Sequence, residues 1–284
     1  MSFCDRQAIP ESLVRDGRSS SDCEDSSRAV DGFEDDVVML RSFSFVSATA
    51  DGSSWEMHRL VQDATRMWLE DRNEFEKFQD RFLYCLHHAF PTGRYENWSR
   101  CQVLFPHAQI AAGYKASGRE ALSDWTTVMY NAAWYAWLKG QLVVAETMAV
   151  ASMQARTSVV GENDEQAIAS TAMLGQILRA QGRWKEAEQL QVKVMEMRQA
   201  TLGADHPDML SSMNNLASTY WNQGRWKEAE QLQHQAVKGR IKRLGKEHPH
   251  TVSALATLKE MRHQAEKEGV QKSKKWWHML GKPA

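Results

Sequence analysis

The sequence predicts a mainly α-helical protein, a solenoid of about three helical hairpins of 42 residues followed by a capping helix. The first observation is that residues 182–190 recur without change at 224–232, 42 residues later. The second is that Gly161, Gly203 and Gly245 recur at the same interval. A period of this length indicates stacked repeats, in which each unit buries its apolar face against its neighbours.

A small winged-helix-like piece of mixed α/β structure is predicted ahead of the repeats, in residues 1–71. Residues 17–36 are rich in serine and acidic side chains, which predicts an exposed, disordered loop. Residues 33–40 predict a short helix, and residues 42–46 alternate in polarity as a strand does. Residues 55–57 can return as a second strand, because the intervening Asp51-Gly52 pair favours a tight turn. The region starts abruptly and is expected to be a truncated domain.

A helix is predicted to follow this hairpin from His58 onward. Its expected apolar face consists of Leu60, Val61, Ala64, Trp68 and Leu69. A winged helix can bind DNA, but the two arginines of this helix share it with three carboxylates. Since the basic stripe that contacts phosphates is missing, DNA binding by this region is not expected.

Residues 72–118 predict helices that link this region to the repeats. They contain the His87-His88 pair and His107, which raise the question of a metal site. Adjacent histidines point to different sides of a helix, and no carboxylate or cysteine lies at ligand spacing. A structural role is predicted for all three histidines, and no metal or cofactor is expected.

The N-terminal segment resembles a known family through residues 5–10 (DRQAIP), 41–45 (RSFSF) and 57–62 (MHRLVQ), together with Trp68-Leu69. These motifs are similar to the segment that follows the nucleotide-binding module in fungal NLR-like (NB-ARC or STAND) receptors. In that family the segment leads into tetratricopeptide repeats of the kinesin-light-chain type, so the resemblance covers nearly the whole chain. No Gly-x-x-x-x-Gly-Lys-Ser/Thr loop occurs in the sequence. The nucleotide-binding module is therefore expected to be lacking, and no nucleotide binding is expected.

The core positions of the hairpins follow from superposing the units at 42 residues. In the first helices they are Thr171, Leu174, Gly175 and Leu178, and then Met213, Leu216, Ala217 and Tyr220. In the second helices Ala187 and Ala229 are predicted to lie where two helices approach closely. This order of small and large residues is similar to that of tetratricopeptide hairpins. Trp184 and Trp226, at an identical phase, are assigned to packing between helices.

The connectors between hairpins have the pattern Leu-Gly-x-x-His-Pro at 202–207 and 244–249. Glycine is predicted to end one helix and proline to start the next. This connector resembles that of kinesin-light-chain-type repeats, and His206 and His248 are predicted to be structural. The earliest unit departs from the pattern, with Asn163-Asp164-Glu165 in place of Asp-His-Pro.

The partner-binding surface is predicted on the first helices of the hairpins, one step away from the core positions. Its residues are Tyr130, Trp134, Trp137, Gln176, Arg179, Asn214, Ser218, Trp221, Glu260 and His263. Aromatic and arginine side chains give most of the binding energy at protein interfaces, which favours a peptide ligand. The alternative is that Trp134 or Trp137 packs against the preceding helices.

Four segments are thus predicted: the winged-helix-like region 1–71, the linking helices 72–118, the repeats with their capping helix 119–267, and a basic aromatic tail 268–284. Charge is distributed unevenly over them. Residues 1–36 carry 10 acidic and 4 basic side chains, whereas residues 238–284 carry 4 acidic and 12 basic ones. The ends of the chain therefore differ strongly in net charge.

The overall composition is that of a globular protein, with 42% hydrophobic and 25% charged residues in 284. Four irregularly spaced cysteines do not form a disulfide framework or a zinc site. The first fifteen residues lack the apolar segment of a secretory signal, and no stretch is apolar enough to span a bilayer. A cytoplasmic location is expected.

The predicted function is a non-enzymatic scaffold that binds a peptide or protein through the concave groove of the repeats. No nucleophile with an adjacent base, paired carboxylates or cofactor motif is recognisable. The resemblance makes a full-length NLR-like receptor one partner class. The alternatives are a kinesin-light-chain-like cargo adaptor and a binder of nucleic acid or membrane surfaces through the basic C-terminal end, although these two ligands are not expected.

Overall fold

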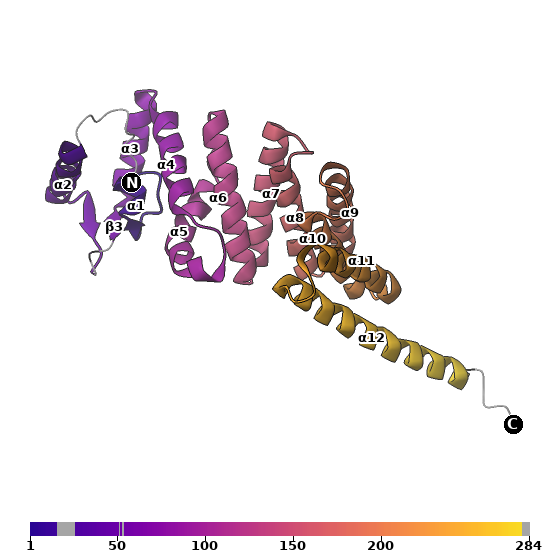
Figure 1. Ribbon diagram of the computed structural model, residues 1–284. Coiled ribbons are helices and arrows are strands. Elements are labelled where there is room, and N and C mark those ends of the chain that lie inside the picture. Colours follow the sequence, from indigo (N-terminus) through magenta and orange to yellow (C-terminus); the bar gives the residue numbers. More distant parts are fainter. Residues whose placement is uncertain (16–25, 51, 53, 280–284) are drawn as a thin grey trace. The chain divides into compact units, whose positions relative to one another are not determined.

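The computed structural model describes residues 1–15, 26–50, 52 and 54–279, and the chain forms two compact units, Met1–Gly161 and Glu162–Ala284 (Figure 1). Each unit is a set of packed helices, and the first also contains a small sheet. The predicted all-α solenoid with a small N-terminal α/β piece is thereby confirmed. The boundary between the units at Gly161 lies inside the predicted repeat segment 119–267.

The first unit begins with a three-stranded antiparallel sheet whose strand order is β1-β3-β2. The strands are β1 (Ile9–Pro10), β2 (Val46–Ala48) and β3 (Ser54–Met57), and the short helix α1 (Ser12–Arg15) follows β1. The predicted hairpin is present, with Val46 opposite Met57, but β2 starts at Val46 and not at residue 42. Ser44 has a φ of 58°, which breaks the extended conformation just before the strand.

The predicted loop 17–36 is wrong for its second half, because helix α2 (Ser26–Ser42) starts at Ser26. Residues 16–25 lie outside the described part of the chain. Phe33 and Val37, one helical turn apart, are 8% and 4% exposed and anchor α2 to the unit. Tertiary burial of this short apolar stripe thus overrides the acidic composition that predicted disorder.

Helix α3 (Arg59–Asp71) exists as predicted, but most of its predicted apolar face is exposed. Leu69 is buried and Val61 half-buried, whereas Leu60 and Trp68 are 70% and 50% exposed and Ala64 is exposed too. The N-terminal residues pack on a different side of the helix. There the buried amide of Gln62 donates hydrogen bonds to the carbonyl oxygens of Met1 and Cys4.

The linking helices are α4 (Phe75–Ala89), the short 3-10 helix η1 (Tyr95–Asn97) and α5 (Trp98–Ala111). Their buried residues include Phe82, Leu83, Leu86, Cys101 and Leu104. Phe78 and Ile110, on the same two α-helices, are 37% and 38% exposed.

His107 of α5 holds the N-terminal segment in place. Its ring is 1% exposed; Nδ1 accepts a hydrogen bond from the backbone N–H of Asp5 at 3.0 Å, and Nε2 donates to the carbonyl of Ala8 at 3.3 Å. Burial lowers the pKa of His107, since the charged ring would lose its hydration. Protonation would also place a hydrogen on Nδ1, where the Asp5 N–H already points.

The first unit is expected to lose stability as the pH falls below 6.5, the usual pKa of histidine. Since the unfolded chain binds this proton more readily than the folded one, the contribution of His107 is complete above that pH and is lost below it, by at most about 1.4 kcal/mol per pH unit. Urea unfolding of the wild type and of His107→Gln at pH 7.5, 6.0 and 5.0 measures this. The difference between the two free energies of unfolding should change with pH; a constant difference would contradict the role of His107.

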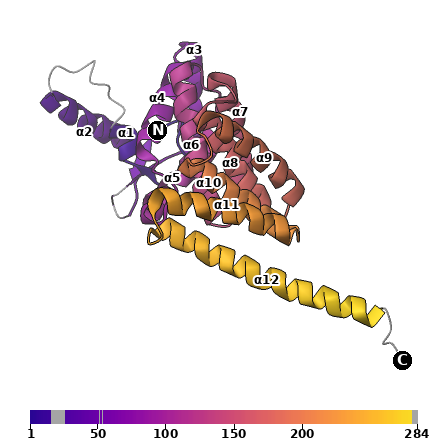
Figure 2. The ribbon, with the colours of Figure 1, turned by 45° about the vertical axis from the view of Figure 1, so that its right-hand side comes forward.

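Helices α6 (Arg119–Leu138) and α7 (Leu142–Val160) form the hairpin that completes the first unit. The second unit consists of α8 (Glu165–Ala180), α9 (Trp184–Thr201), α10 (Pro207–Asn222), α11 (Trp226–Leu244) and α12 (Pro249–Met279), seen from a second side in Figure 2. The 42-residue period therefore predicted each hairpin correctly. Ala187, Ala217 and Ala229 are fully buried, as superposing the units implied.

The connectors show why His206 recurs at His248. Each histidine caps the next helix through Nδ1, which accepts a hydrogen bond at 3.2 Å from the backbone N–H two residues later. In the earliest unit Asp164 does the same with its carboxylate, at 2.8 Å from the N–H of Gln166. The earliest unit thus keeps the helix cap although it departs from the Asp-His-Pro pattern. In the connector at 202–207, Gly203 has a positive φ of 82°, the conformation that typically follows the end of a helix.

A buried amide recurs in the second helices, and its partners differ between units. Gln191 donates to the carbonyl of Gly175, and its Oε1 accepts from the hydroxyl of Thr219 at 2.6 Å. Gln233, 42 residues later, donates instead to the carbonyl of Ala254 on the following helix, and its buried Oε1 has no hydrogen-bond partner among the described residues. The residue in phase with Thr219 is Met261, which has no hydroxyl. At the interface between α11 and α12, Gln233 therefore lacks the hydrogen bond that Gln191 accepts from Thr219.

Arg198 joins three helices, a role that the sequence analysis missed. Its side chain is 9% exposed; one guanidinium nitrogen binds Glu165 of α8 at 2.6 Å. The other donates to the carbonyl of Asp208 and the hydroxyl of Ser212 on α10, at 3.2 and 3.0 Å. The recurrence of arginine at 156, 198 and 240, again at 42 residues, is the signal that could have found it.

Candidate partner-binding surfaces

In the first unit, the predicted binding residues form an aromatic stripe on α6. Tyr130, Trp134 and Trp137 follow helical spacing on one side of α6, and all three are half-buried. The rings of Tyr130 and Trp134 meet edge to face with centroids 6.4 Å apart, and the guanidinium of Arg156 lies 4.8 Å from the centre of the Tyr130 ring. Cation–π and aromatic contacts thus hold the rings while leaving part of each exposed.

The ring of Tyr135, on α6, contacts the preceding helices. Tyr135 is 4% exposed and packs against Phe105 and Trp98 of α5, with ring centroids 5.2 and 6.3 Å apart. Gly93 lies so close to α6 that a Cβ atom there would be 2.6 Å from the Tyr135 nitrogen and 3.1 Å from the Trp134 Cβ. The loop before η1 therefore approaches the backbone of α6 closely at Trp134 and Tyr135.

In the second unit, the predicted residues lie half-buried on two successive first helices. They are Gln176 and Arg179 on α8, and Asn214, Ser218 and Trp221 on α10. The residues between them, such as Ile177, Leu178 and Ala217, are buried, so each helix presents one narrow exposed stripe. The Ser218 hydroxyl donates to the carbonyl of Asn214 at 2.9 Å, and it is thus engaged within its own helix.

Arg179 is a guanidinium with unused hydrogen-bonding capacity. Its Nε is buried without a hydrogen-bond partner among the described residues, and burial lowers its pKa. Nε itself is covered by the protein, but the residue as a whole is half-buried, so a carboxylate or carbonyl oxygen of a ligand can pair with the accessible part of the guanidinium and offset the cost of desolvation. Arg179 occupies the position that is held by Trp221 in the next unit, 42 residues later.

The two tryptophans at identical phase in the second helices differ in their packing. Trp226 is half-buried and meets the ring of Trp221 edge to face, with centroids 4.4 Å apart. Trp184 is 40% exposed, so its assignment to helix packing is wrong. The physical reason is the residue opposite: Trp221 faces Trp226, whereas Arg179 stands at the equivalent place in the unit of Trp184.

A charged network surrounds the turn next to Trp221 and was not predicted. Arg225 binds Glu188 of α9 at 2.6 Å and Glu228 of α11 at 2.5 Å, and its guanidinium carbon lies 3.9 Å from the centre of the Tyr220 ring. The hydrogen bond from Arg225 holds the pKa of Glu228 below its usual value. This network ties α9 to the α10–α11 turn and restrains the backbone that carries Trp221.

The last two predicted residues, Glu260 and His263, are exposed on α12. The inward side of this helix is marked instead by Ala254, Leu258 and Met261, which are 2–4% exposed. Glu260 and His263 are therefore accessible but lie outside the half-buried stripes of α8 and α10.

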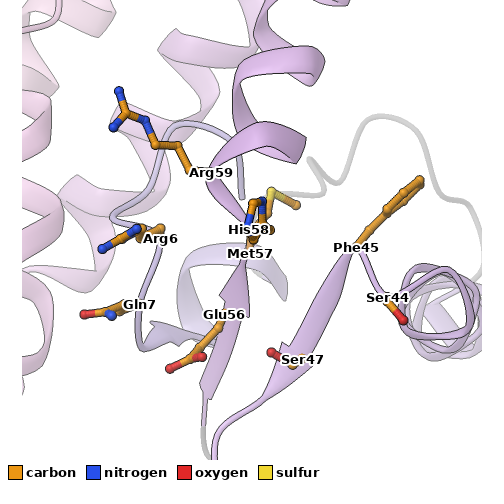
Figure 3. Close-up of a pocket in the computed structure, with 9 residues that line it drawn as sticks. All are labelled: Arg6, Gln7, Ser44, Phe45, Ser47, Glu56, Met57, His58 and Arg59. Atoms are coloured by element: carbon orange, nitrogen blue, oxygen red, sulfur yellow. The ribbon is translucent and has the colours of Figure 1, made fainter.

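A pocket of about 340 Å³ lies at the N-terminal hairpin, where no site was predicted (Figure 3). It is lined by Arg6, Gln7, Ser44, Phe45, Ser47, Glu56, Met57, His58 and Arg59. Figure 3 shows the side chains of Arg6 and Arg59 on one side of the hairpin and that of Phe45 on the other. The two arginines and the Phe45 ring therefore line different sides of the pocket.

The hairpin geometry agrees with the comparison of the sequence with protein families. Three overlapping matches to the tetratricopeptide repeat model cover residues 125–200, 166–242 and 208–268, which together span half of the chain. The chain belongs to the tetratricopeptide repeat family. Tetratricopeptide folds are typically protein-interaction scaffolds, and the interaction-scaffold part of the predicted function is supported. Residues 1–74 of this tetratricopeptide protein match a domain of unknown function (DUF7779).

A nucleotide-binding leucine-rich repeat (NLR)-like protein of Hyaloscypha variabilis is 31% identical to the tetratricopeptide protein over 134 residues. The match covers 47% of this chain and 14% of the length of that relative. The resemblance to fungal NLR-like receptors that the sequence motifs predicted is thereby confirmed.

Two solved structures share the tetratricopeptide fold. Both are of a Podosopora anserina putative kinesin light chain with nearly identical TPR-like repeats, one of them a point variant. The variant is 22% identical, with a TM-score of 0.53, over 71% of this chain and 97% of its own. The other is 23% identical, with a TM-score of 0.52, over 66% of this chain and 90% of its own. At this identity the likeness concerns the fold.

In residues 1–15, 26–50 and 54–279, no helix is long and apolar enough to cross a membrane. Over the same part of the chain, no three histidine, cysteine, aspartate or glutamate side chains are grouped so that they could hold a metal ion.

Proposed function

We propose that this tetratricopeptide protein is a non-enzymatic, cytoplasmic scaffold that binds a peptide segment of a partner protein along the exposed stripes of α8 and α10. The observation that carries the proposal is the pairing of Arg179 and Trp221, half-exposed at equivalent positions of successive first helices. Each has a specific binding capacity: Arg179 is a half-buried guanidinium whose covered Nε has no hydrogen-bond partner among the described residues, and the Trp221 indole packs edge to face on Trp226. Arginine and tryptophan are the residues that most often dominate binding energy.

The chemistry of the two stripes defines the ligand. Gln176 and Asn214 carry amides that can pair with the backbone of an extended or helical peptide. Arg179 favours a carboxylate or carbonyl oxygen, and Trp221 favours an apolar side chain.

The test is selection of a random 15-residue peptide library, displayed on phage, on the immobilised full chain. The affinity of each selected peptide is then measured by fluorescence anisotropy. Trp221→Ala and Arg179→Ala are each expected to weaken binding at least tenfold, which corresponds to about 1.4 kcal/mol or more.

Trp184→Ala is the matched control, because Trp184 is exposed and belongs to the nine-residue segment 182–190 that recurs at 224–232. It is expected to change the affinity less than twofold. Circular dichroism checks that Trp221→Ala keeps the helical signal despite the loss of the Trp226 contact. Selected peptides that bind all folded variants equally would refute the proposed surface.

The chain is similar to part of an NLR-like protein of Hyaloscypha variabilis, and we propose a full-length NLR-like receptor as one partner class to test. A kinesin-light-chain-like adaptor role has only the likeness of folds behind it and remains the alternative. Nucleic acid and membrane surfaces are not expected as ligands, since the stripes of α8 and α10 carry a single arginine among neutral side chains.

A further inference from the structure

Helix α2 has an exposed apolar side in addition to its buried one. Phe33 and Val37 face the unit, whereas Val38 and Met39 are 63% and 60% exposed. Beyond the end of the helix, Phe43 and Phe45 are 65% and 43% exposed, and their rings stack with centroids 5.8 Å apart. Four large apolar side chains thus remain accessible along α2 and the residues that follow it, more than isolated surface positions would give.

Carboxylates accompany this apolar surface. Glu34, Asp35 and Asp36 are all exposed on the turns of α2 that lead to Val38 and Met39. We call Glu34, Asp35, Val38, Met39, Phe43 and Phe45 the acidic-apolar face; Asp36 flanks it on another side of the helix. A helix that carries lysines beside large apolar side chains would match this face in both charge and apolar character.

The same chain contains such a helix at its other end. Helix α12 has 31 residues, and its last buried side chain among those described is Met261. Arg262 pairs with Glu230 of α11 at 2.8 Å, and Figures 1 and 2 both show α12 continuing beyond α11. Residues 262–279 contain five basic and two acidic residues, together with Val270, Trp276, Trp277 and Met279.

We propose that the protein associates head to tail, with residues 262–279 of α12 from one copy lying on the acidic-apolar face of α2 in a second copy. Charge and apolar character are complementary between the two segments. Their lengths also match, since 18 and 17 helical residues each span about 26 Å. Helix α12 is continuous to Met279 and contains no loop at which this half would turn back on its own unit.

Such a contact joins two different surfaces, so each copy keeps one free surface of each kind. Heterologous contacts of this type extend into rings or open chains of copies rather than closing as symmetric dimers. The association is expected to depend on salt, because charges of opposite sign at an exposed interface are screened. Sedimentation velocity of the full chain should therefore show oligomers at low salt. Their dissociation constant should rise at least tenfold from low to high salt.

The decisive test exchanges the charges. Glu34→Lys, Asp35→Lys and Asp36→Lys together, or Lys272→Glu, Lys274→Glu and Lys275→Glu together, should each abolish oligomers. Mixing the two variants should restore association, because the lysines on α2 of one then meet the glutamates on α12 of the other. Wild-type protein that stays monomeric at all concentrations would overturn the proposal, as would variants that associate like wild type or a mixture that remains monomeric.

A second pair of variants separates this face from exposed apolar surface in general. Met39→Ser with Phe43→Ser should weaken association at least tenfold. Leu60→Ser with Met67→Ser removes side chains of α3 that are 70% and 66% exposed, and it should leave association unchanged. Circular dichroism verifies the fold of each variant. Dissociation caused by the α3 variant, with none caused by the α2 variant, would reject the acidic-apolar face as the docking surface.

Discussion

Replacing Ala229 with tryptophan is expected to lower the melting temperature by roughly 10 °C. Ala229 is fully buried on α11 in a cluster with Ala217 of α10 and Met261 of α12, and the ring of Trp221 packs against this cluster. An indole cannot fit where a methyl group already touches three neighbours, so the helices must move apart. Overfilling of this kind costs about 3 kcal/mol or more, and for a domain of this size each kcal/mol corresponds to a few degrees.

Lys227→Trp is the matched control for this prediction. It introduces the same side chain two residues away, at an exposed position of the same helix. Its effect on stability is expected to be within about 0.5 kcal/mol, as for other surface substitutions. Thermal unfolding followed by circular dichroism compares the two variants. An unchanged melt for Ala229→Trp would contradict the close approach of the helices at this position.

Replacing Arg198 with methionine is expected to destabilise the protein by about 2–3 kcal/mol, because it removes buried hydrogen bonds to a carboxylate, a carbonyl and a hydroxyl. Glu165 is 45% exposed and can be hydrated after the change, which limits the loss below that of a fully buried ion pair. Methionine keeps most of the aliphatic volume, so the effect reports on the polar contacts. Urea unfolding monitored by circular dichroism measures it.

The repeat itself supplies the comparison for Arg198. Arg240 is the equivalent residue one unit later. It is half-buried and donates a hydrogen bond of 3.4 Å to the carbonyl of His250. Arg240→Met is expected to cost less than about 1 kcal/mol. Equal losses for the two arginines would mean that stability comes from their aliphatic stems and not from the network around Arg198.

The candidate surfaces were predictable from phase and only partly from residue type. A helix that stacks on two neighbours has one stripe left for ligands, so a 3.6-residue period placed Gln176, Arg179 and Trp221 on half-exposed positions. Phase did not reveal the Arg225 network, because its partners Glu188 and Glu228 lie on two different helices.

Two expectations failed for a common reason. The apolar face of α3 and the packing of Trp184 were inferred from local pattern, yet Leu60, Trp68 and Trp184 are exposed. Periodicity states which residues share a face, but burial depends on what covers that face. In α3 the N-terminal residues cover the side of Gln62, and at Trp184 no indole stands opposite.

The sequence by itself determined the hairpins of the second unit and their register, because the nine-residue segment repeated after 42 residues, the glycines with positive φ and the helix caps are all local features. Only the tertiary structure decided which buried amide finds a partner, which of two identical tryptophans packs, and how α2 forms within an acidic stretch. These outcomes depend on side chains far apart in the chain. Thr219 completes the bonds of Gln191 across 28 residues, whereas Met261 leaves Gln233 without its counterpart.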